Sequence, residues 1–533
     1  MLFLFIVLFL IMLIYYFTKT RRALHMLQQN SYNENNRYIK WVMNNTKASF
    51  LYLDILGLVA LIPVEFITGP MLKNIWLIVL IALYILALYN LLNIAAKDQN
   101  KKPLVTTSRI KRMWVTLIII FFIPVIVGLL IPSKLPSMAL NIGILLVISY
   151  FLVYIANIIN YPVERLVFHH YRHRACQKLK TMNNLKVIGI TGSYGKTSSK
   201  NILNDILNTK YISLPSPKNF NTDYGLIMTI NNYLDKFDDV FIAEMGAYAK
   251  GDIASLCKLV NPKYGILTTI GTAHLETFGS EENIIKTKFE LIESLPKDGV
   301  AVLNKDDIKQ VNYPFINKVR KIWIGIDNKD ADIYASNIYC TSEGTIFDVY
   351  FKDLNETYSF QTKLLGKHSV YNILSSLALG LEFGITIKEL IIAVKKVKPV
   401  EHRLELKKLG NMYQIDDAYN ANPIGAQMAL EVLDMMPGTK VVVTPGMVEL
   451  GAKETDYNRI FGKQISEVAN YVILIGKMRT IPIYEGLISK GYKKDNIFIL
   501  DNVREAYPLI LSLKTDKDIY ALFENDLPDT YNE

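Results

Sequence analysis

The chain has 533 residues, enough for about three folding units at ~150 residues each. Its formal net charge is +10, but residues 1–186 carry 20 Lys and Arg against 5 Asp and Glu, while the remainder carries 39 against 44. The second part is therefore mildly acidic and has no basic stripe with interleaved aromatic residues, which argues against nucleic acid as a partner. The three cysteines, Cys176, Cys257 and Cys340, form no metal-binding pattern.

The first part of the chain contains five apolar stretches that are long enough, or nearly so, to cross a hydrocarbon core of about 30 Å as helices. They cover residues 1–17, 49–68, 72–94, 114–132 and 139–161. We therefore predict a membrane domain over residues 1–165 with about five transmembrane helices, in contact with membrane lipid.

The loops between these stretches predict the orientation of the chain. Segments 18–47 and 95–113 each carry six Lys or Arg, whereas the other two connections carry only Lys73 and Lys134. Basic loops stay on the cytoplasmic side, so the N-terminus is predicted to lie outside the cell membrane and everything after residue 161 in the cytoplasm. Two acids in or near the second stretch, Asp54 and Glu65, are expected at the membrane interface rather than on a transport pathway.

A basic linker is predicted at residues 166–185. Its aromatic and basic side chains suit a helix that lies along an anionic membrane surface, and a plain linker helix fits equally well.

The stretch VIGITGSYGKTSSKNILNDIL, which begins at Val187, runs from an apolar strand through a glycine-punctuated turn to a helical pattern. In such a loop the glycines let backbone N–H groups point into one concavity, the lysine reaches the β and γ phosphates, and the following hydroxyl holds Mg²⁺. A strict phosphate loop would need glycine at position 190, where this chain has Ile190. We predict binding of ATP and Mg²⁺ by this variant. The residues of the loop predicted to bind the nucleotide are Thr191, Gly192, Ser193, Gly195, Lys196, Thr197 and Ser198.

Other polar residues stand where parallel strands are expected to end. Glu244 follows the apolar strand VFIA, and His274 follows the apolar run YGILTTI. Open α/β sheets collect ligands at these ends, although a single strand-end Glu is more often a solvated cap and a single His is more often structural. Lys288 lies on an amphipathic helix and would ordinarily be an exposed lysine.

The C-terminal part alternates apolar strands, such as KVVVTP (440–445) and YVILIG (471–476), with helical stretches, which is typical of a small Rossmann-like sheet. It lacks a GxGxxG motif, so no dinucleotide is predicted there. The predicted fold is an α-helical membrane region followed by α/β domains. These are a P-loop ATPase-like central domain (186–399) and a Rossmann-like C-terminal domain (400–533).

The spacing GxTGxxGKT resembles the phosphate loop of the Mur ligase family, and the resemblance continues over some 340 residues, in family order. The segments that carry it are AEMGAYAKGDI (243–253), GTAHLETFGS (271–280), IIKTKFELIESL (284–295), VLNKDD (302–307), GKHSVYNILSSLALG (366–380), EHRLEL (401–406) and IDDAYNANPIGAQMALEVL (415–433). The last segment is most similar to the D-alanyl-D-alanine-adding muramyl ligases.

This resemblance implies an ATP-dependent ligase that activates an acceptor carboxylate as an acyl phosphate and joins it to an amino acid or dipeptide in peptidoglycan precursor synthesis. It implies two Mg²⁺ ions, with a carbamylated lysine beside them. The implied metal ligands are Thr197, Glu244, His274 and Lys288, and the implied catalytic residues are Lys196, His274, Lys288 and Arg403.

The resemblance also implies that Asn304 contacts the adenine, and that Arg403 and Asp417 of the C-terminal domain contact the γ-phosphate and the ribose. Closure of the domains would then complete the site and exclude water from a labile acyl phosphate. Weaker family positions are matched by Asn219, Asn221 and His368, each of which is equally consistent with a structural role.

Two features depart from the family. The predicted spans stand where ligases that act on UDP-linked substrates have a uridine-binding domain, and the segment ALFENDLPDTYNE lacks the Lys-Gly-Ser run of the dipeptide-adding enzymes. The acceptor could therefore be a lipid-linked or a UDP-linked muramyl peptide, and we expect it to be held at the membrane, where an anchor raises its local concentration.

Three alternatives remain open at this point. They are a polyglutamate-type or other amino-acid ligase, a membrane transporter or sensor driven by a cytoplasmic P-loop ATPase, and a pseudoenzyme that only binds nucleotide.

Overall fold

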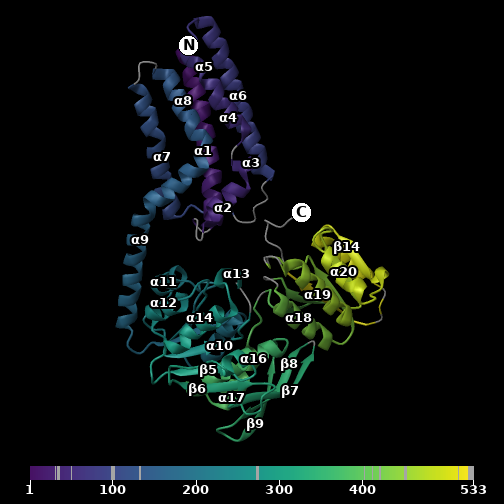
Figure 1. The fold of residues 1–533 in the computed structure, drawn as a ribbon. Helices are drawn as coiled ribbons and strands as arrows, with labels where there is room; N and C mark the ends of the chain where they lie inside the picture. The colour runs from purple at the N-terminus through teal and green to yellow at the C-terminus, as the bar shows by residue number, and fades with distance from the viewer. Residues whose placement is uncertain are drawn as a thin grey trace. The chain divides into compact units, whose positions relative to one another are not determined.

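The computed structural model describes the chain except for residues 31, 33–35, 50, 98–102, 131–133, 272–274, 342, 401, 411, 419–421, 449, 451–452, 514, 516 and 526–533. The chain divides between His169 and His170 into two compact units. The first is helical, and the second contains two β-sheets with helices on their faces (Figure 1).

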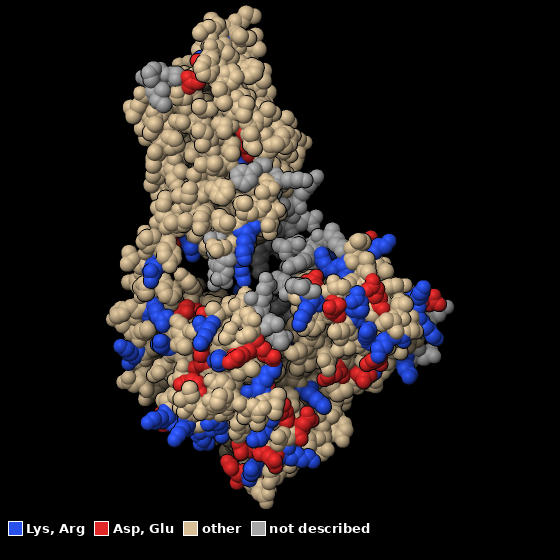
Figure 2. Space-filling view, viewed as in Figure 1, with Lys and Arg blue, Asp and Glu red and all other residues tan. Residues whose placement is uncertain are grey.

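The helical unit is a bundle of long apolar helices. Its elements are α1 (Leu2–Gln29), α2 (Arg37–Asn44), α3 (Thr46–Ser49), α4 (Tyr52–Leu61), α5 (Pro63–Phe66), α6 (Pro70–Lys97), α7 (Ser108–Leu129), α8 (Lys134–Val147) and α9 (Ser149–Thr181). Within the described residues, four helices are long and apolar enough to cross a membrane: α1, α6, α7 and α9. On the visible face of this bundle charged side chains are scarce, whereas Lys, Arg, Asp and Glu intermingle over the other unit (Figure 2).

Two of the five predicted spans differ from single helices. Residues 49–68 fold as the short helices α4 and α5, because the ring of Pro63 opens a new helix at its first position. Together α4 and α5 run along the bundle, from the end where α3 lies to the opposite end, where the N-terminus lies (Figure 1). Residues 139–161 are divided between α8 and α9, where the carbonyl of Leu146 accepts hydrogen bonds from Lys19 Nζ and Ser149 Oγ.

A buried ion pair ties α1 to α4. Lys19 Nζ donates to Asp54 Oδ2 at 2.5 Å and to the Leu146 carbonyl at 2.8 Å, and Tyr15 Oη donates to Asp54 Oδ1 at 2.5 Å. The side chains of Lys19 and Asp54 are fully buried. Asp54, which we expect at the membrane interface, is buried inside the bundle with a cationic partner.

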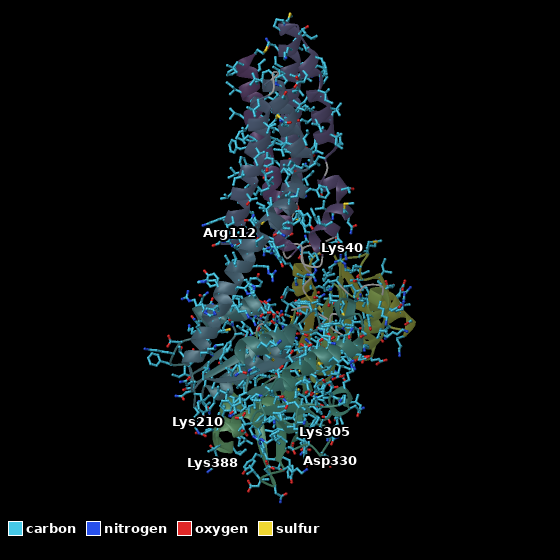
Figure 3. The ribbon with its side chains drawn as sticks, turned by 60° about the vertical axis from the view of Figure 1, so that its left-hand side comes forward. Lys40, Arg112, Lys210, Lys305, Asp330 and Lys388 are labelled. Atoms are coloured by element: carbon cyan, nitrogen blue, oxygen red, sulfur yellow. The ribbon has the colours of Figure 1, made fainter. Side chains whose placement is uncertain are left out.

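We expect Asp54→Leu alone to destabilise the bundle by about 3–5 kcal/mol, because it leaves Lys19 as an uncompensated buried charge. The double variant Lys19→Met, Asp54→Leu should recover most of that loss. Thermal unfolding of the full-length chain in lipid nanodiscs would measure both losses. The matched control is the more exposed ion pair between Arg112, labelled in Figure 3, and Glu164. Additive losses in the double variant would contradict this expectation.

The central domain is built on a nine-stranded sheet in the order β2-β3-β1-β4-β5-β6-β7-β8-β9, parallel except for the β7–β8 and β8–β9 pairs. Its strands are β1 (Lys186–Thr191), β2 (Ser213–Pro215), β3 (Val240–Glu244), β4 (Tyr264–Leu267), β5 (Val300–Asn304), β6 (Arg320–Gly325), β7 (Ile333–Thr341), β8 (Gly344–Phe351) and β9 (Glu356–Thr362). Its helices are α10 (Lys196–Leu207), α11 (Asp223–Asn232), α12 (Asp252–Val260), α13 (Leu275–Phe278), α14 (Glu281–Glu293), α15 (Ile308–Val311), α16 (Lys367–Glu382) and α17 (Ile387–Lys396).

Successive side chains along a strand point to opposite faces of the sheet, and both faces of this sheet are covered by helices. Ile188 and Ile190 of β1 share one core with apolar residues of α10, α16 and α17. Gly189 between them faces the other side, where a Cβ would lie 2.7 Å from Leu291 of α14. A parallel sheet covered on both faces leaves its strand ends as the place for ligands.

The C-terminal domain has a six-stranded sheet in the order β10-β11-β15-β12-β13-β14, parallel except for the β10–β11 pair. Its strands are β10 (Glu405–Leu409), β11 (Met412–Asp417), β12 (Thr439–Thr444), β13 (Tyr471–Ile475), β14 (Ile497–Leu500) and β15 (Ile519–Glu524). Its helices are α18 (Pro423–Met435), α19 (Glu454–Val468), α20 (Ile481–Ser489), η3 (Lys494–Asn496), η4 (Val503–Glu505) and α21 (Ala506–Ser512). The predicted fold class is confirmed.

Candidate active site

The predicted phosphate loop joins the end of β1 to the start of α10. Gly195 caps the helix with a φ of 81°, in the left-handed region that glycine adopts at no steric cost. Gly192 has a φ of 150°, and a Cβ there would lie 1.9 Å from Thr268 Oγ1. Both positions therefore require glycine, and the loop brings its backbone to the positive end of the α10 dipole.

The other loop residues fix this conformation through their side chains. Thr191 Oγ1 donates to the Met245 carbonyl at 2.9 Å, and Ser193 Oγ donates to the Gly271 carbonyl at 3.0 Å. Ser198 lies in the first turn of α10. The loop is thus tied to the segments that follow β3 and β4.

Lys196 is the first residue of α10, and its ammonium group lies over the loop. Nζ donates to the carbonyls of Gly192 and Ser193 at 2.8 and 3.0 Å. The pKa of Lys196 is lowered to about 8, mainly by burial; the carboxylate of Glu244 opposes this change, and the nearby Arg403 contributes to it. The loop therefore holds a desolvated cation where phosphate oxygens would enter.

Glu244 ends β3 next to the loop, because β3 pairs with β1 in parallel register and Ile190 is the partner of Glu244. It is 1% exposed. Its Oε1 accepts hydrogen bonds from Thr197 Oγ1 at 3.2 Å and Asn221 Nδ2 at 3.1 Å. A carboxylate beside the hydroxyl of the phosphate loop is a donor set that suits Mg²⁺, with phosphate oxygens and water completing the shell.

Lys288 lies on α14 and is 3% exposed, so it is not the ordinary surface lysine that its pattern suggested. Burial and the cation of Lys196 lower the pKa of Lys288 to about 7. By contrast, Lys286 is exposed and pairs with Glu282 one turn away. A small hollow of about 50 Å³ is lined by Gly192, Ser193, Lys196, Asn221, Gly246, Ala247, Tyr248 and Lys288.

Two further residues singled out from the sequence are His274 and His368. His274 lies outside the described residues. Among the residues that are described, no group of three or more His, Cys, Asp or Glu could hold a metal ion. His368, matched weakly by the sequence, is half-buried at the start of α16, and desolvation lowers its pKa to about 4, which favours a neutral imidazole.

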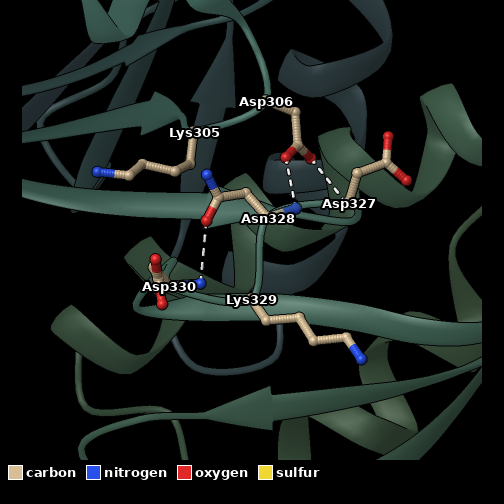
Figure 4. A pocket seen from close by; sticks show the side chains of 6 residues that line it. All are labelled: Lys305, Asp306, Asp327, Asn328, Lys329 and Asp330. Atoms are coloured by element: carbon tan, nitrogen blue, oxygen red, sulfur yellow. Dashed lines mark hydrogen bonds between the residues drawn. The ribbon is translucent and has the colours of Figure 1, made fainter.

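Asn304 ends β5, two strands from β1 in the sheet, and its Oδ1 accepts from the backbone N–H of Asp306 at 3.0 Å. Beyond it the ends of β5 and β6 border an open hollow of about 570 Å³ (Figure 4). Its lining residues are Lys305, Asp306, Asp327, Asn328, Lys329 and Asp330. The Asp306 carboxylate accepts from three backbone N–H groups of residues 326–328 and from Tyr371 Oη, so it builds the turn rather than awaiting a ligand.

The C-terminal domain brings Arg403 and Asp417 to the same region. Arg403 is close enough to influence the pKa values of both Lys196 and Asp417. The Leu404 N–H donates to Asp417 Oδ1 at 3.3 Å. Burial raises the pKa of Asp417 to about 6, against the lowering effect of Arg403.

Sequence reasoning missed two buried charged residues. Lys200 contacts Glu244, and its spacing with Leu203 and Leu207 on α10 was the available signal that it faces the core. Glu524 ends β15 as the register partner of Asp417 and is 1% exposed. Burial and the neighbouring Asp417 raise the pKa of Glu524 well above its usual range. Its position after an apolar strand was the same signal that pointed to Glu244.

Two protein-family profiles match this chain, one in the central domain and one in the C-terminal domain. The family profile described as "Mur ligase middle domain" matches residues 190–380, and the one described as "Mur ligase, glutamate ligase domain" matches residues 402–523.

Individual relatives agree with these profiles. The UDP-N-acetylmuramoyl-tripeptide--D-alanyl-D-alanine ligase of Escherichia coli (strain K12) is 34% identical over 270 residues, covering 50% of this chain and 59% of the relative. The enzyme of that name from Bacillus subtilis (strain 168) is 32% identical over 316 residues, covering 58% and 67%. The crystal structure of MurF ligase from Thermotoga maritima in complex with ADP superposes with a TM-score of 0.60 at 27% identity, covering 67% of this chain and 80% of that chain.

Proposed function

The chain belongs to the Mur ligase family, and from that premise we propose that it is an ATP-dependent ligase of peptidoglycan precursor synthesis. It phosphorylates an acceptor carboxylate and joins the resulting acyl group to the amine of an amino acid or dipeptide. The substrates we favour are a muramyl peptide and D-alanyl-D-alanine, after which its relatives are named.

One observation carries this proposal: Lys196, Glu244 and Lys288 converge beside a glycine loop, with Arg403 of the C-terminal domain in electrostatic range. Phosphoryl transfer depends mainly on positioning and on cationic charge around the γ-phosphate. In this assignment Lys196 and Arg403 bind phosphate oxygens. Asn304 and Asp417 hold the adenine and the ribose.

Mg²⁺ fits the donors at the end of β3, where Thr197 and Glu244 would hold it, and His274 is the further ligand proposed from the sequence. A bound Mg²⁺ supplies Lewis-acid charge to the phosphate oxygens. We assign Lys288 as the carbamylated lysine, since a buried amine with a pKa of about 7 has a large neutral fraction, roughly half, near pH 7, and the neutral amine can react with CO₂. Carbamylation would convert a cation beside Lys196 into an anion.

The chain spans 59% and 67% of the lengths of the two curated relatives named above, and its helical unit lies outside the matched family regions. We propose that this unit is embedded in the cell membrane and holds the ligase domains in the cytoplasm, where ATP is available. The acceptor would then be a muramyl peptide presented at the membrane by a lipid carrier or delivered as the UDP-linked form.

The proposal is tested by mass spectrometry of products from the full-length chain in nanodiscs. ATP, D-alanyl-D-alanine and either a UDP-linked or a lipid-linked muramyl peptide are supplied. We expect ADP release that requires both acceptor and amine, and a product heavier than the acceptor by one dipeptide less water. ADP release that is stimulated by glutamate instead of the dipeptide would favour a polyglutamate-type ligase. ATP hydrolysis without any acceptor would favour a transporter or sensor.

A further inference from the structure

Lys200 is a lysine buried in the core of the central domain, one helical turn after Lys196. It is 1% exposed. Its Nζ lies 3.0 Å from Glu244 Oε2 and donates to the carbonyl of Lys218 at 2.6 Å. A buried ammonium group is costly unless it is paired, so these two contacts account for its position.

The two oxygens of Glu244 have different partners. Oε1 accepts from Thr197 and Asn221, whereas Oε2 faces Lys200. Oε2 accepts no hydrogen bond from a described residue, so the ion pair with the Lys200 ammonium group is the contact that restrains this side of the carboxylate. Its other oxygen is thereby kept beside the hydroxyl of Thr197.

Lys200 also holds the segment that supplies Asn221. Its bond to the Lys218 carbonyl anchors residues 218–221, where Lys218 itself has a left-handed φ of 48°. At the other end of this segment the Gly246 N–H donates to the Asn221 carbonyl at 2.7 Å. A single ammonium group therefore joins α10, the end of β3 and this loop.

We propose that Lys200 is a positioning residue for the divalent cation: it orients Glu244 so that Oε1 and Thr197 Oγ1 face the cation of the bound nucleotide complex. This inference rests on the proposed function, which assigns Thr197 and Glu244 as the magnesium donors. Residues that orient the ligands of a metal typically change its affinity about 10–100-fold when removed.

Two simpler roles for Lys200 make different predictions. If it were only a positive charge near the cation, its removal would tighten cation binding, because like charges repel. If it only supported the fold, its removal would weaken nucleotide binding with and without the cation. If Lys200 orients Glu244, its removal should weaken Mg²⁺ binding and leave nucleotide binding without Mg²⁺ unchanged.

The experiment uses the full-length chain with Lys200→Met, titrated calorimetrically with ADP in the presence of EDTA and then with Mg²⁺ in the presence of ADP. We expect the Mg²⁺ affinity to fall about 10-fold or more, with the ADP affinity in EDTA unchanged within about twofold. Lys210→Met, an exposed lysine beyond the end of α10 (Figure 3), is the matched control and should leave both affinities unchanged.

Two further variants keep the test decisive if Lys200→Met lowers the melting temperature. Asn221→Ala leaves the buried lysine in place and should also weaken Mg²⁺ selectively. In a Glu244→Gln background, Lys200→Met should add no further loss, because the oriented carboxylate is already absent.

Unchanged or tighter Mg²⁺ binding by Lys200→Met would overturn the inference and leave the proposed function intact, as would an equal loss of ADP affinity in EDTA. Failure of the unmodified chain to bind ADP and Mg²⁺ would overturn both.

Discussion

Lys196→Ala is expected to reduce product formation by about 10³-fold, the largest effect of any single substitution in this chain. The loop carbonyls of Gly192 and Ser193 hold its ammonium group at the N-terminus of α10, where it is desolvated. A cation in such an environment stabilises developing phosphate charge far more than one in water. The measurement is single-turnover formation of ADP and of the ligated product.

Lys258→Ala, an exposed lysine on α12, serves as the control for this measurement and should retain full activity. Unchanged product formation in Lys196→Ala would remove the basis for a phosphorylated intermediate in this protein. The melting temperature should be compared in parallel, so that loss of folding is not mistaken for loss of chemistry.

The second large effect is expected from Lys288→Ala, which should lower the rate of ligation by about 10²-fold or more, since charge stabilisation around a transferred phosphoryl group amounts to several kcal/mol. In the unmodified chain, ¹³C-labelled bicarbonate should produce a carbamate resonance by NMR. Only the neutral amine forms a carbamate. With a pKa of about 7, the reactive fraction should fall about tenfold per unit once the pH is well below 7.

The matched control is Lys286→Ala, two residues away on the same helix but exposed and paired with Glu282. It should keep both the resonance and the activity. A carbamate signal that survives in Lys288→Ala, or that disappears in Lys286→Ala, would contradict the assignment of the modified lysine.

Much of the candidate site could be predicted because its residues belong to short, contiguous sequence motifs. The glycines at 192 and 195 and the lysine and hydroxyl that follow them lie within six residues of one another, and both glycines have a positive φ. Strand-end residues such as Glu244 could be proposed because apolar runs predict the strands and parallel topology collects their ends on one edge. The family resemblance added Lys288, Arg403 and Asp417, which their own patterns would not have distinguished.

The helical unit shows which features the local sequence does not specify. Hydropathy predicted the apolar stretches, and Pro63 is a local reason for the division of residues 49–68. In residues 139–161 the break between α8 and α9 follows Leu146, whose carbonyl accepts hydrogen bonds from Lys19 of α1 and from Ser149. Lys19 reaches the Leu146 carbonyl across 127 positions of sequence. No pattern within either helix specifies that contact.

By itself, the sequence determined the α/β class, the phosphate loop and the order of motifs along the chain. These depend on side-chain periodicity and on backbone preferences that act over a few residues. The packing of the folded chain makes Lys200 the partner of Glu244, sets Glu524 beside Asp417 and buries Lys288, and none of these could be predicted from local patterns. The physical reason is that strand register and helix packing bring together groups far apart in the chain, and burial then changes the charge each group can carry.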